Sequence, residues 1–136
     1  MNPRISLSFN GQCEAAFRFY EAHLPGRLTF FLTWGDSPMA KEVPSEWGAK
    51  VCHATLEVGD MHFSGSDAPP GSYKVPQGFH VQLDIEAVEE AQRIFEALAQ
   101  NGQIGVALQE TFWARCYGMV TDQFGVPWEI NCGRPA

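Results

Sequence analysis

The sequence is short of basic residues and of long apolar runs, and each shortage argues against a class of protein. Its 136 residues include 9 Lys and Arg against 16 Asp and Glu, which gives a formal net charge of −7. A nucleic-acid-binding surface needs a stripe of Lys and Arg to replace phosphate counterions, so we expect no nucleic-acid partner. No apolar run is long enough to span a bilayer, so we expect no membrane segment.

Ordered cysteine spacing and the common nucleotide-binding motifs are also missing. There is no G-x-G-x-x-G, no P-loop and no G-x-S-x-G, which disfavours nucleotide cofactors and a serine nucleophile. The cysteines show no metal-type spacing, and apolar neighbours indicate that they are small core residues: Cys13, Cys52, Cys116 and Cys132. Free thiols, together with an N-terminal segment that lacks the features of a signal peptide, favour a cytoplasmic location.

Hydrophobic residues make up 45% of the chain, and their spacing predicts one domain, 1–136, built from two similar halves of about 1–68 and 78–136. The first half is expected to contain a strand, a helix and three strands, at 5–9, 13–24, 27–34, 51–58 and 61–66. The second half repeats this order, at 79–85, 87–101, 104–108, 117–121 and 126–132. The repeat lies in the order of elements, because sequence identity between the halves is faint.

This order predicts an α+β fold of paired βαβββ modules. Sheets of this kind curl into a cup that holds a ligand on its concave face, with the helices on the outer face. Two Pro- and Gly-containing loops, 35–50 and 66–78, are expected to shape the pocket. Neither loop carries a recognisable binding motif, so the substrate stays open.

Glu129 is the most informative single residue, because it stands between Trp128 and Ile130 in an apolar strand. Alternation along a strand puts Glu129 on the face opposite to these two neighbours. A carboxylate on an inward face is costly unless it is paired, hydrogen-bonded or bound to a metal. Glu129 is therefore our candidate for the catalytic group that moves a proton.

The strand 79–85 supplies a second polar row. Four of its apolar residues are expected to lie under the second helix: Phe79, Val81, Leu83 and Ile85. The opposite face carries His80, Gln82 and Asp84, and Asn131 shares the face of Glu129. If these faces line one cup, His80 and Glu129 converge from two strands. They are half of a ligand set for Zn, Ni, Mn or Fe, or a base and its orienting partner without metal. The alternative is a solvent-exposed sheet face with an isolated His and Glu.

Other residues complete the expected substrate pocket. His53 begins an alternating run in which Thr55 and Glu57 share its face, and a structural role is its alternative. Trp113 is expected in a loop, as a lid or a stacking platform, with packing at a dimer interface as the alternative. The pocket set is His53, Gln82, Trp113 and Asn131. The remaining histidines, His23 and His62, are interpreted as structural.

Five segments resemble the PhnB-like branch of the vicinal oxygen chelate superfamily. They are SFNGQCEAAFRFY at 8–20, HATL at 53–56, GSDAPPG at 65–71, QETFW at 109–113 and DQFGVPWEINC at 122–132. The resemblance extends over nearly the whole chain. This superfamily includes glyoxalase I, bleomycin-resistance proteins and extradiol dioxygenases. The resemblance implies paired βαβββ modules, a small-molecule ligand and a homodimer.

The resemblance also implies where a metal would bind. Metal-using members such as glyoxalase I take ligands from four strand positions, two in each module. The second-module positions match His80 and Glu129, whereas the first-module positions fall near Ile5 or Ser6 and near Ser64, which are poor ligands. Members of this branch often carry the name 3-demethylubiquinone-9 3-methyltransferase. This chain has no Gly-rich nucleotide-binding turn, which argues against methyl transfer.

Two functions remain open from the sequence. One is a divalent-metal-dependent lyase, isomerase or dioxygenase-type enzyme that acts on a small oxygenated substrate. In it a metal would polarise adjacent oxygens and Glu129 would move the proton. The alternative is a non-catalytic protein of the bleomycin-resistance type, which sequesters a small cationic or aromatic compound and needs no cofactor.

Overall fold

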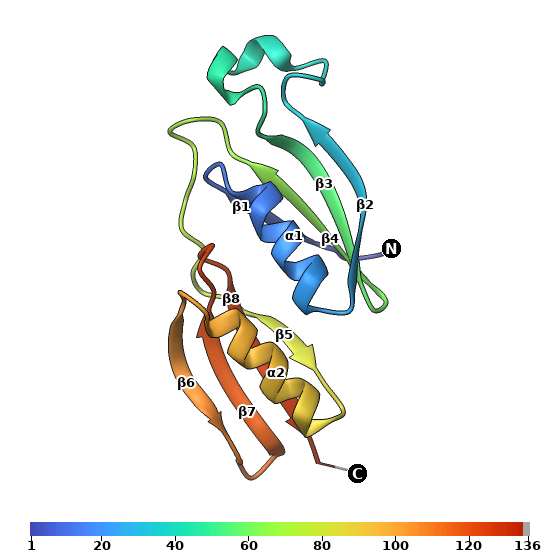
Figure 1. Ribbon diagram of the computed structural model, residues 1–136, viewed down its shortest axis with the longest axis vertical. Coiled ribbons are helices and arrows are strands. Elements are labelled where there is room, and N and C mark those ends of the chain that lie inside the picture. The colour runs from blue at the N-terminus through green and yellow to red at the C-terminus, as the bar shows by residue number, and fades with distance from the viewer. Residues whose placement is uncertain (135–136) are drawn as a thin grey trace. The chain divides into compact units, whose positions relative to one another are not determined.

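The computed structural model, which describes residues 1–134, shows the same order of elements twice along the chain (Figure 1). The chain divides into two units, Met1–Lys74 and a second that begins at Val75. Each unit holds one four-stranded sheet and one α-helix. The predicted α+β class with paired modules is therefore confirmed.

The first unit is built from β1 (Ile5–Phe9), α1 (Cys13–His23), β2 (Gly26–Thr33), β3 (Val51–Val58) and β4 (Met61–Asp67). Its sheet has the order β1-β4-β3-β2, with a parallel β1–β4 pair and antiparallel pairs elsewhere. The helix buries residues at the i, i+3, i+4 and i+7 positions of one face: Cys13, Ala16, Phe17 and Tyr20. They cover the buried strand residues Leu7, Leu56 and Phe63.

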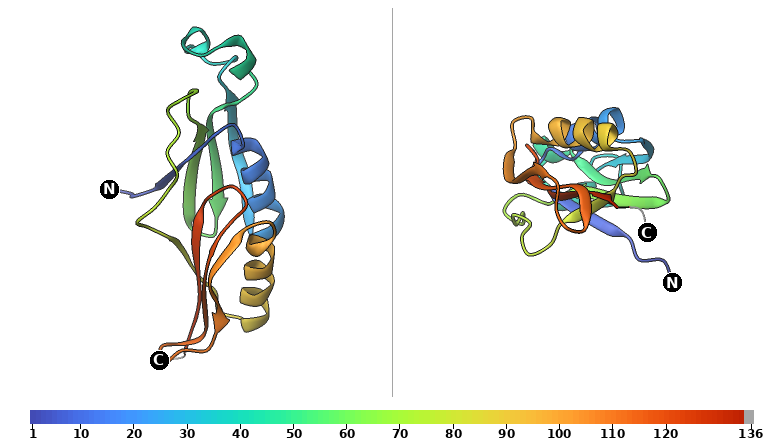
Figure 2. Two further views of the ribbon diagram at one scale, coloured as in Figure 1. Left: turned by 90° about the vertical axis from the view of Figure 1, so that its left-hand side faces the viewer. Right: turned by 90° about the horizontal axis from the view of Figure 1, so that it is seen from below.

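The second unit repeats this plan with β5 (Val81–Asp84), α2 (Val88–Ala99), β6 (Gln103–Gln109), β7 (Ala114–Thr121) and β8 (Pro127–Gly133). The strand order β5-β8-β7-β6 matches that of the first sheet, and β5 again pairs in parallel with β8. The α2 helix packs on β7 and β8 through Ala91, Ile94, Phe95 and Leu98. In each unit the helix covers one face of its own sheet and leaves the other face open (Figure 2).

Two of the sequence expectations for the second unit are wrong in detail. Phe79 does not lie under α2, because it precedes β5 and is 39% exposed. The strand begins only at Val81, where its pairing with Trp128 of β8 starts, and Gly78 before it has a φ of 84°. The strand expected at 117–121 begins three residues earlier, because Ala114 already pairs with Gly133.

The first unit is held together by the buried carboxylate of Asp67, at the end of β4. Its Oδ1 accepts hydrogen bonds from the backbone N–H groups of Gly11 and Cys13, both at 2.9 Å, and Oδ2 accepts one from Val51 at 2.8 Å. Gln12, the residue that precedes α1, makes no side-chain cap. Asp67 therefore supplies the negative group that the N-terminus of α1 needs, and it joins α1 to β3 and β4.

The second unit has a different buried carboxylate, Asp122, in the turn between β7 and β8. Its Oδ1 accepts hydrogen bonds from the backbone N–H groups of Phe124 and Val126, at 2.9 and 3.0 Å. Its Oδ2 accepts one from Nε1 of Trp128 at 2.9 Å. Asp122 thus shapes its own turn and fixes the indole of Trp128, which is fully buried beneath α2.

The segment between β2 and β3 is ordered by contacts at its two ends. Trp34 N donates to Lys50 O at 2.8 Å, Gly35 N donates to Gly48 O at 2.9 Å, and Trp34 Nε1 donates to Asp67 O at 3.0 Å. Two short 3-10 helices, η1 (Ala40–Glu42) and η2 (Ser45–Trp47), fill it. The sequence predicted a loop here but not these turns.

All four cysteines are free. Cys13, Cys116 and Cys132 are buried as predicted, whereas Cys52 is half-buried. Within residues 1–134, no helix is both long enough and apolar enough to cross a membrane.

Candidate functional site

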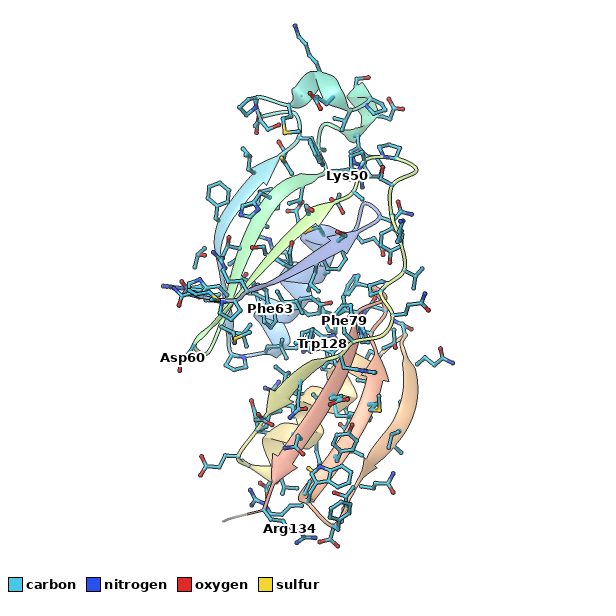
Figure 3. The ribbon with its side chains drawn as sticks, turned by 180° about the vertical axis from the view of Figure 1, so that it is seen from behind. Lys50, Asp60, Phe63, Phe79, Trp128 and Arg134 are labelled. Atoms are coloured by element: carbon cyan, nitrogen blue, oxygen red, sulfur yellow. The ribbon has the colours of Figure 1, made fainter. Side chains whose placement is uncertain are left out.

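The open face of the second sheet collects the polar side chains of β5 and β8. Gln82 lies opposite Glu129, and Asp84 lies opposite Asn131. Trp128 and Ile130 are fully buried on the side of α2. Since side chains alternate along a strand, Glu129 and Asn131 point to the other side, the side seen in Figure 3.

His80 and Glu129 come together on this face. Nδ1 of His80 lies 3.7 Å from Oε1 of Glu129, and the two side chains are 34% and 22% exposed. His80 reaches this place from the residue just before β5, and Glu129 from the middle of β8. The structure thus brings together the imidazole and the carboxylate that the sequence assigned to one site.

Tyr117 is the third member of this cluster. It lies on β7 between the buried residues Cys116 and Gly118 and opposite Asn131, which puts its ring on the open face. Burial raises the pKa of Tyr117, and the charge and hydrogen bonding of Glu129 raise it further. The phenol therefore keeps its proton at neutral pH and acts as a hydrogen-bond donor beside the carboxylate.

Trp113 extends the cluster at its aromatic end. Its ring meets that of Tyr117 edge-on, with centroids 5.1 Å apart, and Phe112 meets Trp113 in the same way at 4.8 Å. Trp113 is 45% exposed and Phe112 is 90% exposed. Trp113 immediately precedes β7, so the predicted platform lies beside the carboxylate cluster, whereas Trp128, which the sequence grouped with it, belongs to the core.

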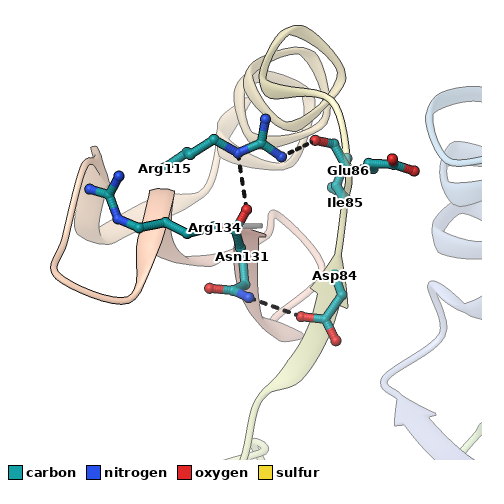
Figure 4. Close-up of a pocket in the computed structure, with 7 residues that line it drawn as sticks. Asp84, Ile85, Glu86, Arg115, Asn131 and Arg134 are labelled. Atoms are coloured by element: carbon teal, nitrogen blue, oxygen red, sulfur yellow. Dashed lines mark hydrogen bonds between the residues drawn. The ribbon is translucent and has the colours of Figure 1, made fainter. Parts of the chain in front are cut away.

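The other end of the open face is a pocket with a volume of about 420 Å³ (Figure 4). Oδ1 of Asp84 accepts hydrogen bonds from Gln82 Nε2 at 2.9 Å and from Asn131 Nδ2 at 3.1 Å. Oδ1 of Asn131 is buried and has no hydrogen-bond partner within the described chain. A buried acceptor without a donor is unfavourable, so this oxygen is suited to receive a donor from a bound molecule.

Arg115 borders the same pocket and is fixed by the backbone. Its Nε donates to Gly133 O at 3.0 Å, and its Nη2 donates to Glu86 O at 2.5 Å (Figure 4). Arg134, on the opposite rim, donates to Glu110 Oε2 at 2.7 Å and to Thr111 O at 3.0 Å. The two guanidinium groups therefore hold the pocket wall, and the free acceptors come from the carboxylates and the amide.

The open face of the first sheet has a different character. Ser6 pairs with Ser64 and Ser8 with Ser66, so hydroxyl groups occupy the positions where a metal-using relative would need ligands. His53 lies on β3 opposite Leu32, with its ring 5.6 Å from that of Phe30. His53 is thus placed on the open face of its own sheet, as its alternation predicted. Its assignment to the substrate pocket stays a prediction.

Two other histidines have local contacts that agree with structural roles. His23 packs against Phe19, with ring centroids 4.4 Å apart. Nε2 of His62 lies 3.9 Å from Oε1 of Glu57, and Glu57 is paired with Arg27 at 3.2 Å.

The donor atoms of the cluster fit a divalent metal only in part. An imidazole nitrogen and a carboxylate oxygen are suitable ligands, but catalytic zinc sites usually have three protein ligands. Among residues 1–134, no three His, Cys, Asp or Glu side chains are grouped so that they would hold an ion. His80 and Glu129 are therefore half of a protein ligand set.

Sequence reasoning left out three residues of this face as site residues: Asp84, Arg115 and Tyr117. The signal for Tyr117 and Arg115 was available, because Ala114, Cys116 and Gly118 are small residues that alternate with them. The role of Asp84 as the common acceptor of Gln82 and Asn131 depends on the β5–β8 register, which no local pattern provides.

Comparison with known proteins agrees with this architecture. The family model of the glyoxalase/bleomycin resistance protein/dioxygenase superfamily matches residues 7–130. Protein YjdN of Escherichia coli (strain K12) is 39% identical over 133 residues, which cover 92% of this chain and 90% of that protein.

Two solved structures are similar over 98% of this chain and the whole of their own. Protein PA1353 from Pseudomonas aeruginosa is 39% identical with a TM-score of 0.86. The PhnB protein from Bacillus cereus is 21% identical with a TM-score of 0.83, a likeness that shows the shared fold.

Proposed function

Because the chain belongs to the glyoxalase/bleomycin resistance protein/dioxygenase superfamily, we propose that it binds a small oxygenated molecule on the open face of its second sheet, where Glu129 transfers a proton. The observation that supports this most directly is the contact between His80 Nδ1 and Glu129 Oε1, 3.7 Å apart and beside Tyr117. A carboxylate, an imidazole and a protonated phenol on one face form an acid–base set.

Each residue has a distinct role in this proposal. Glu129 accepts a proton from the bound molecule and returns it at a neighbouring atom. His80 orients the carboxylate, and Tyr117 donates a hydrogen bond to the oxygen on which negative charge develops. Trp113 covers the apolar part of the ligand, and the unpaired Oδ1 of Asn131 receives a hydroxyl or amino donor.

A divalent ion fits the proposal as an additional group. His80 and Glu129 would hold it, and it would supply positive charge beside the oxygens of the bound molecule. The fosfomycin resistance protein FosX from Listeria monocytogenes, which shares the fold at 10% identity and a TM-score of 0.68, has been crystallised in complex with Mn(II). Since this chain offers two suitable side chains, oxygens of the ligand or water would fill the remaining positions.

Metal binding is tested on the whole chain after treatment with a chelator. Zn²⁺, Ni²⁺, Mn²⁺ and Fe²⁺ are added one at a time, and retained metal per chain and Tm are measured. We expect one of these ions to be retained by the wild type and lost from H80A and E129Q. The control is H53A, which removes an exposed imidazole of the first sheet and should keep the ion. Equal retention in the H80A/E129Q double variant would refute this metal assignment.

Proton transfer is tested separately, with pyruvate and dihydroxyacetone as probes that carry an acidic C–H beside a carbonyl oxygen. Exchange of that hydrogen in D₂O is followed by NMR. We expect the wild type and H53A to accelerate the exchange and E129Q to leave it at the uncatalysed rate. An identical acceleration by E129Q would remove Glu129 from its role.

The second candidate is a non-catalytic protein that sequesters a small cationic or aromatic compound. The hydroxyl groups at Ser6 and Ser64, which leave the metal set half complete, favour it. The stack of Phe112, Trp113 and Tyr117 beside Glu129 suits such a ligand. Wild-type protein that binds a quaternary ammonium dye through Trp113 and Glu129, retains no metal and exchanges no probe hydrogen would support this candidate.

The homodimer that the family resemblance implies is also part of the proposal. The exposed rings of Phe112 and Trp113 suit a partner surface. Sedimentation should give twice the chain mass of 15.1 kDa, and a clean monomer would contradict the expectation.

A further inference from the structure

Two cysteines face each other across the last hairpin of the chain. Cys116 of β7 is the direct partner of Cys132 of β8 in the antiparallel register. Directly opposite residues of antiparallel strands have Cα atoms about 4.5–5.5 Å apart and side chains on the same face. A disulfide bond needs a Cα separation of about 4.4–6.8 Å. The backbone therefore already has the spacing that a Cys116–Cys132 bond requires.

The two thiols are also in contact and shielded. Cys116 is 5% exposed and Cys132 is fully buried, and Sγ of Cys132 donates to Glu86 O at 3.3 Å. Burial raises the pKa of the Cys116 thiol and the neighbouring Cys132 raises it further, against the opposing effect of Arg115. At neutral pH the pair therefore rests as two protonated thiols.

We propose that Cys116 and Cys132 form a reversible cross-strand disulfide when the protein meets an oxidant of the peroxide class. The S–S bond forms as the two S–H bonds break, and the sulfur atoms together lose two electrons and two protons. The peroxide O–O bond breaks, and the two oxygens take up those electrons, those protons and their own to leave as two water molecules. A thiol reductant reverses the step.

The surroundings of the pair tolerate the bond. Oxidation removes the S–H donor of Cys132 from Glu86 O, but this carbonyl oxygen keeps the hydrogen bond from Arg115 Nη2 at 2.5 Å. No buried acceptor is left without a donor by the reaction. The register shift between Ala114 and Cys116 lies next to the pair, so the new bond would fix the strands where their ladder is irregular.

The other cysteines offer no equivalent pairing. Cys13 lies in α1, and Cys52 of β3 has no residue opposite it in the β2–β3 register, which passes from His53 to Val51. The proposed modification is independent of the proposed function, because Cys116 and Cys132 lie on the buried face of the second sheet and Glu129 lies on the open one.

The experiment oxidises the folded full-length chain with hydrogen peroxide, quenches it and counts free thiols. We expect two of the four thiols to be lost, without a covalent dimer on a non-reducing gel. Mass spectrometry of a digest should contain one linked peptide pair that joins Cys116 to Cys132 and disappears with dithiothreitol. Because the bond closes a loop in the unfolded chain, Tm of the oxidised protein should rise by a few degrees.

Matched variants separate the proposal from general oxidation. The C13S/C52S variant keeps the pair and should lose both of its thiols, whereas C132S, and C116A as a second choice if C132S does not fold, should give no linked peptide. The H80A/E129Q variant should form the bond as the wild type does. Four surviving thiols after prolonged oxidation, links to Cys13 or Cys52, or a Cys116–Cys132 link that forms only in urea would each overturn the proposal.

Discussion

Asp67 and Asp122, one in each unit, show how the same plan is stabilised in two ways. Asp67 accepts backbone hydrogen bonds from Gly11, Cys13 and Val51, which come from two distant segments of its unit. Asp122 accepts two from its own turn and one from the indole of Trp128. The first carboxylate joins a helix to the sheet, and the second orders one hairpin. Equal strand order thus does not require equal placement of the buried charge.

The open sheet faces differ even more. The first carries paired serines, such as Ser6 with Ser64, whereas the second carries Glu129 with His80 and Tyr117 around it. The first sheet shows that this strand order forms with hydroxyl groups on its open face. The ionisable groups of the second face are therefore not needed for the architecture, which is why we assign them to ligand chemistry.

The largest expected effect comes from the buried carboxylates. D67N should lower the free energy of unfolding by about 3 kcal/mol, because the amide keeps one acceptor oxygen and turns an NH₂ group toward a backbone donor. D122N should cost less, about 2 kcal/mol, because its acceptor oxygen can retain the two turn hydrogen bonds. Urea unfolding of both variants measures the difference. An equal loss would show that the number of segments joined by Asp67 does not matter.

Each unit also has a strand glycine on which a helix phenylalanine packs. A Cβ at Gly65 would lie 2.4 Å from the ring of Phe17, and a Cβ at Gly118 would lie 2.7 Å from the ring of Phe95. G65A and G118A should each cost about 2 kcal/mol by overpacking, measured by thermal or urea unfolding.

Two controls sharpen this pair. In G105A the nearest atom to the new methyl group is 3.7 Å away, so stability should change by less than about 0.5 kcal/mol. The F17L/G65A double variant should recover part of the loss. A neutral G65A would contradict the close packing of α1 on its sheet.

Alkaline pH should destabilise the first unit through Cys13. Burial raises the pKa of this thiol, and the charges of Asp67 and Glu14 raise it further. The unfolded chain ionises first, so the contribution is fully present below the ordinary thiol pKa of about 8.5 and falls above it by about 1.4 kcal/mol per pH unit. Urea unfolding between about pH 8 and pH 10 should show a shallower decline for C13A. The same decline in both proteins would contradict the assignment to Cys13.

The smallest effect on stability is expected on the open face. E129Q should change the free energy of unfolding by less than about 0.5 kcal/mol, because the His80–Glu129 contact is partly exposed. Its signature is spectroscopic: without the carboxylate charge, the pKa of Tyr117 should fall toward its ordinary value while burial keeps it raised. Ultraviolet titration measures this, and Y117F identifies the signal. An unchanged tyrosine titration would separate Tyr117 from Glu129.

Periodicity explains which parts of this fold could be predicted. The apolar spacing of Cys13, Ala16, Phe17 and Tyr20 identified α1, and alternation around Glu129 gave its orientation. Strand bounds were less accurate, because partners decide them: β5 is short since only Val81–Asp84 pair with β8. The parallel β5–β8 pairing joins residues far apart in the sequence, so no local pattern encodes it.

The site was predictable to the extent that it follows from alternation. The convergence of His80 and Glu129 required only that two polar strand faces meet. The acceptor role of Asp84 and the unpaired oxygen of Asn131 depend on side-chain positions across strands, which residue types do not specify. The same holds for Asp67, whose three backbone donors are brought together only by the folded chain.

The clamped ends of the segment between β2 and β3 make it an interchangeable cassette. The backbone hydrogen bond from Trp34 to Lys50 and the one that Asp67 accepts from Val51 hold the two strand ends without help from the residues between them. Since Val43 is the buried apolar side chain of the interior stretch 36–47, a foreign recognition loop of another length can be spliced there once that contact is supplied. The scaffold would then acquire a new binding specificity while its sheets stay unaltered.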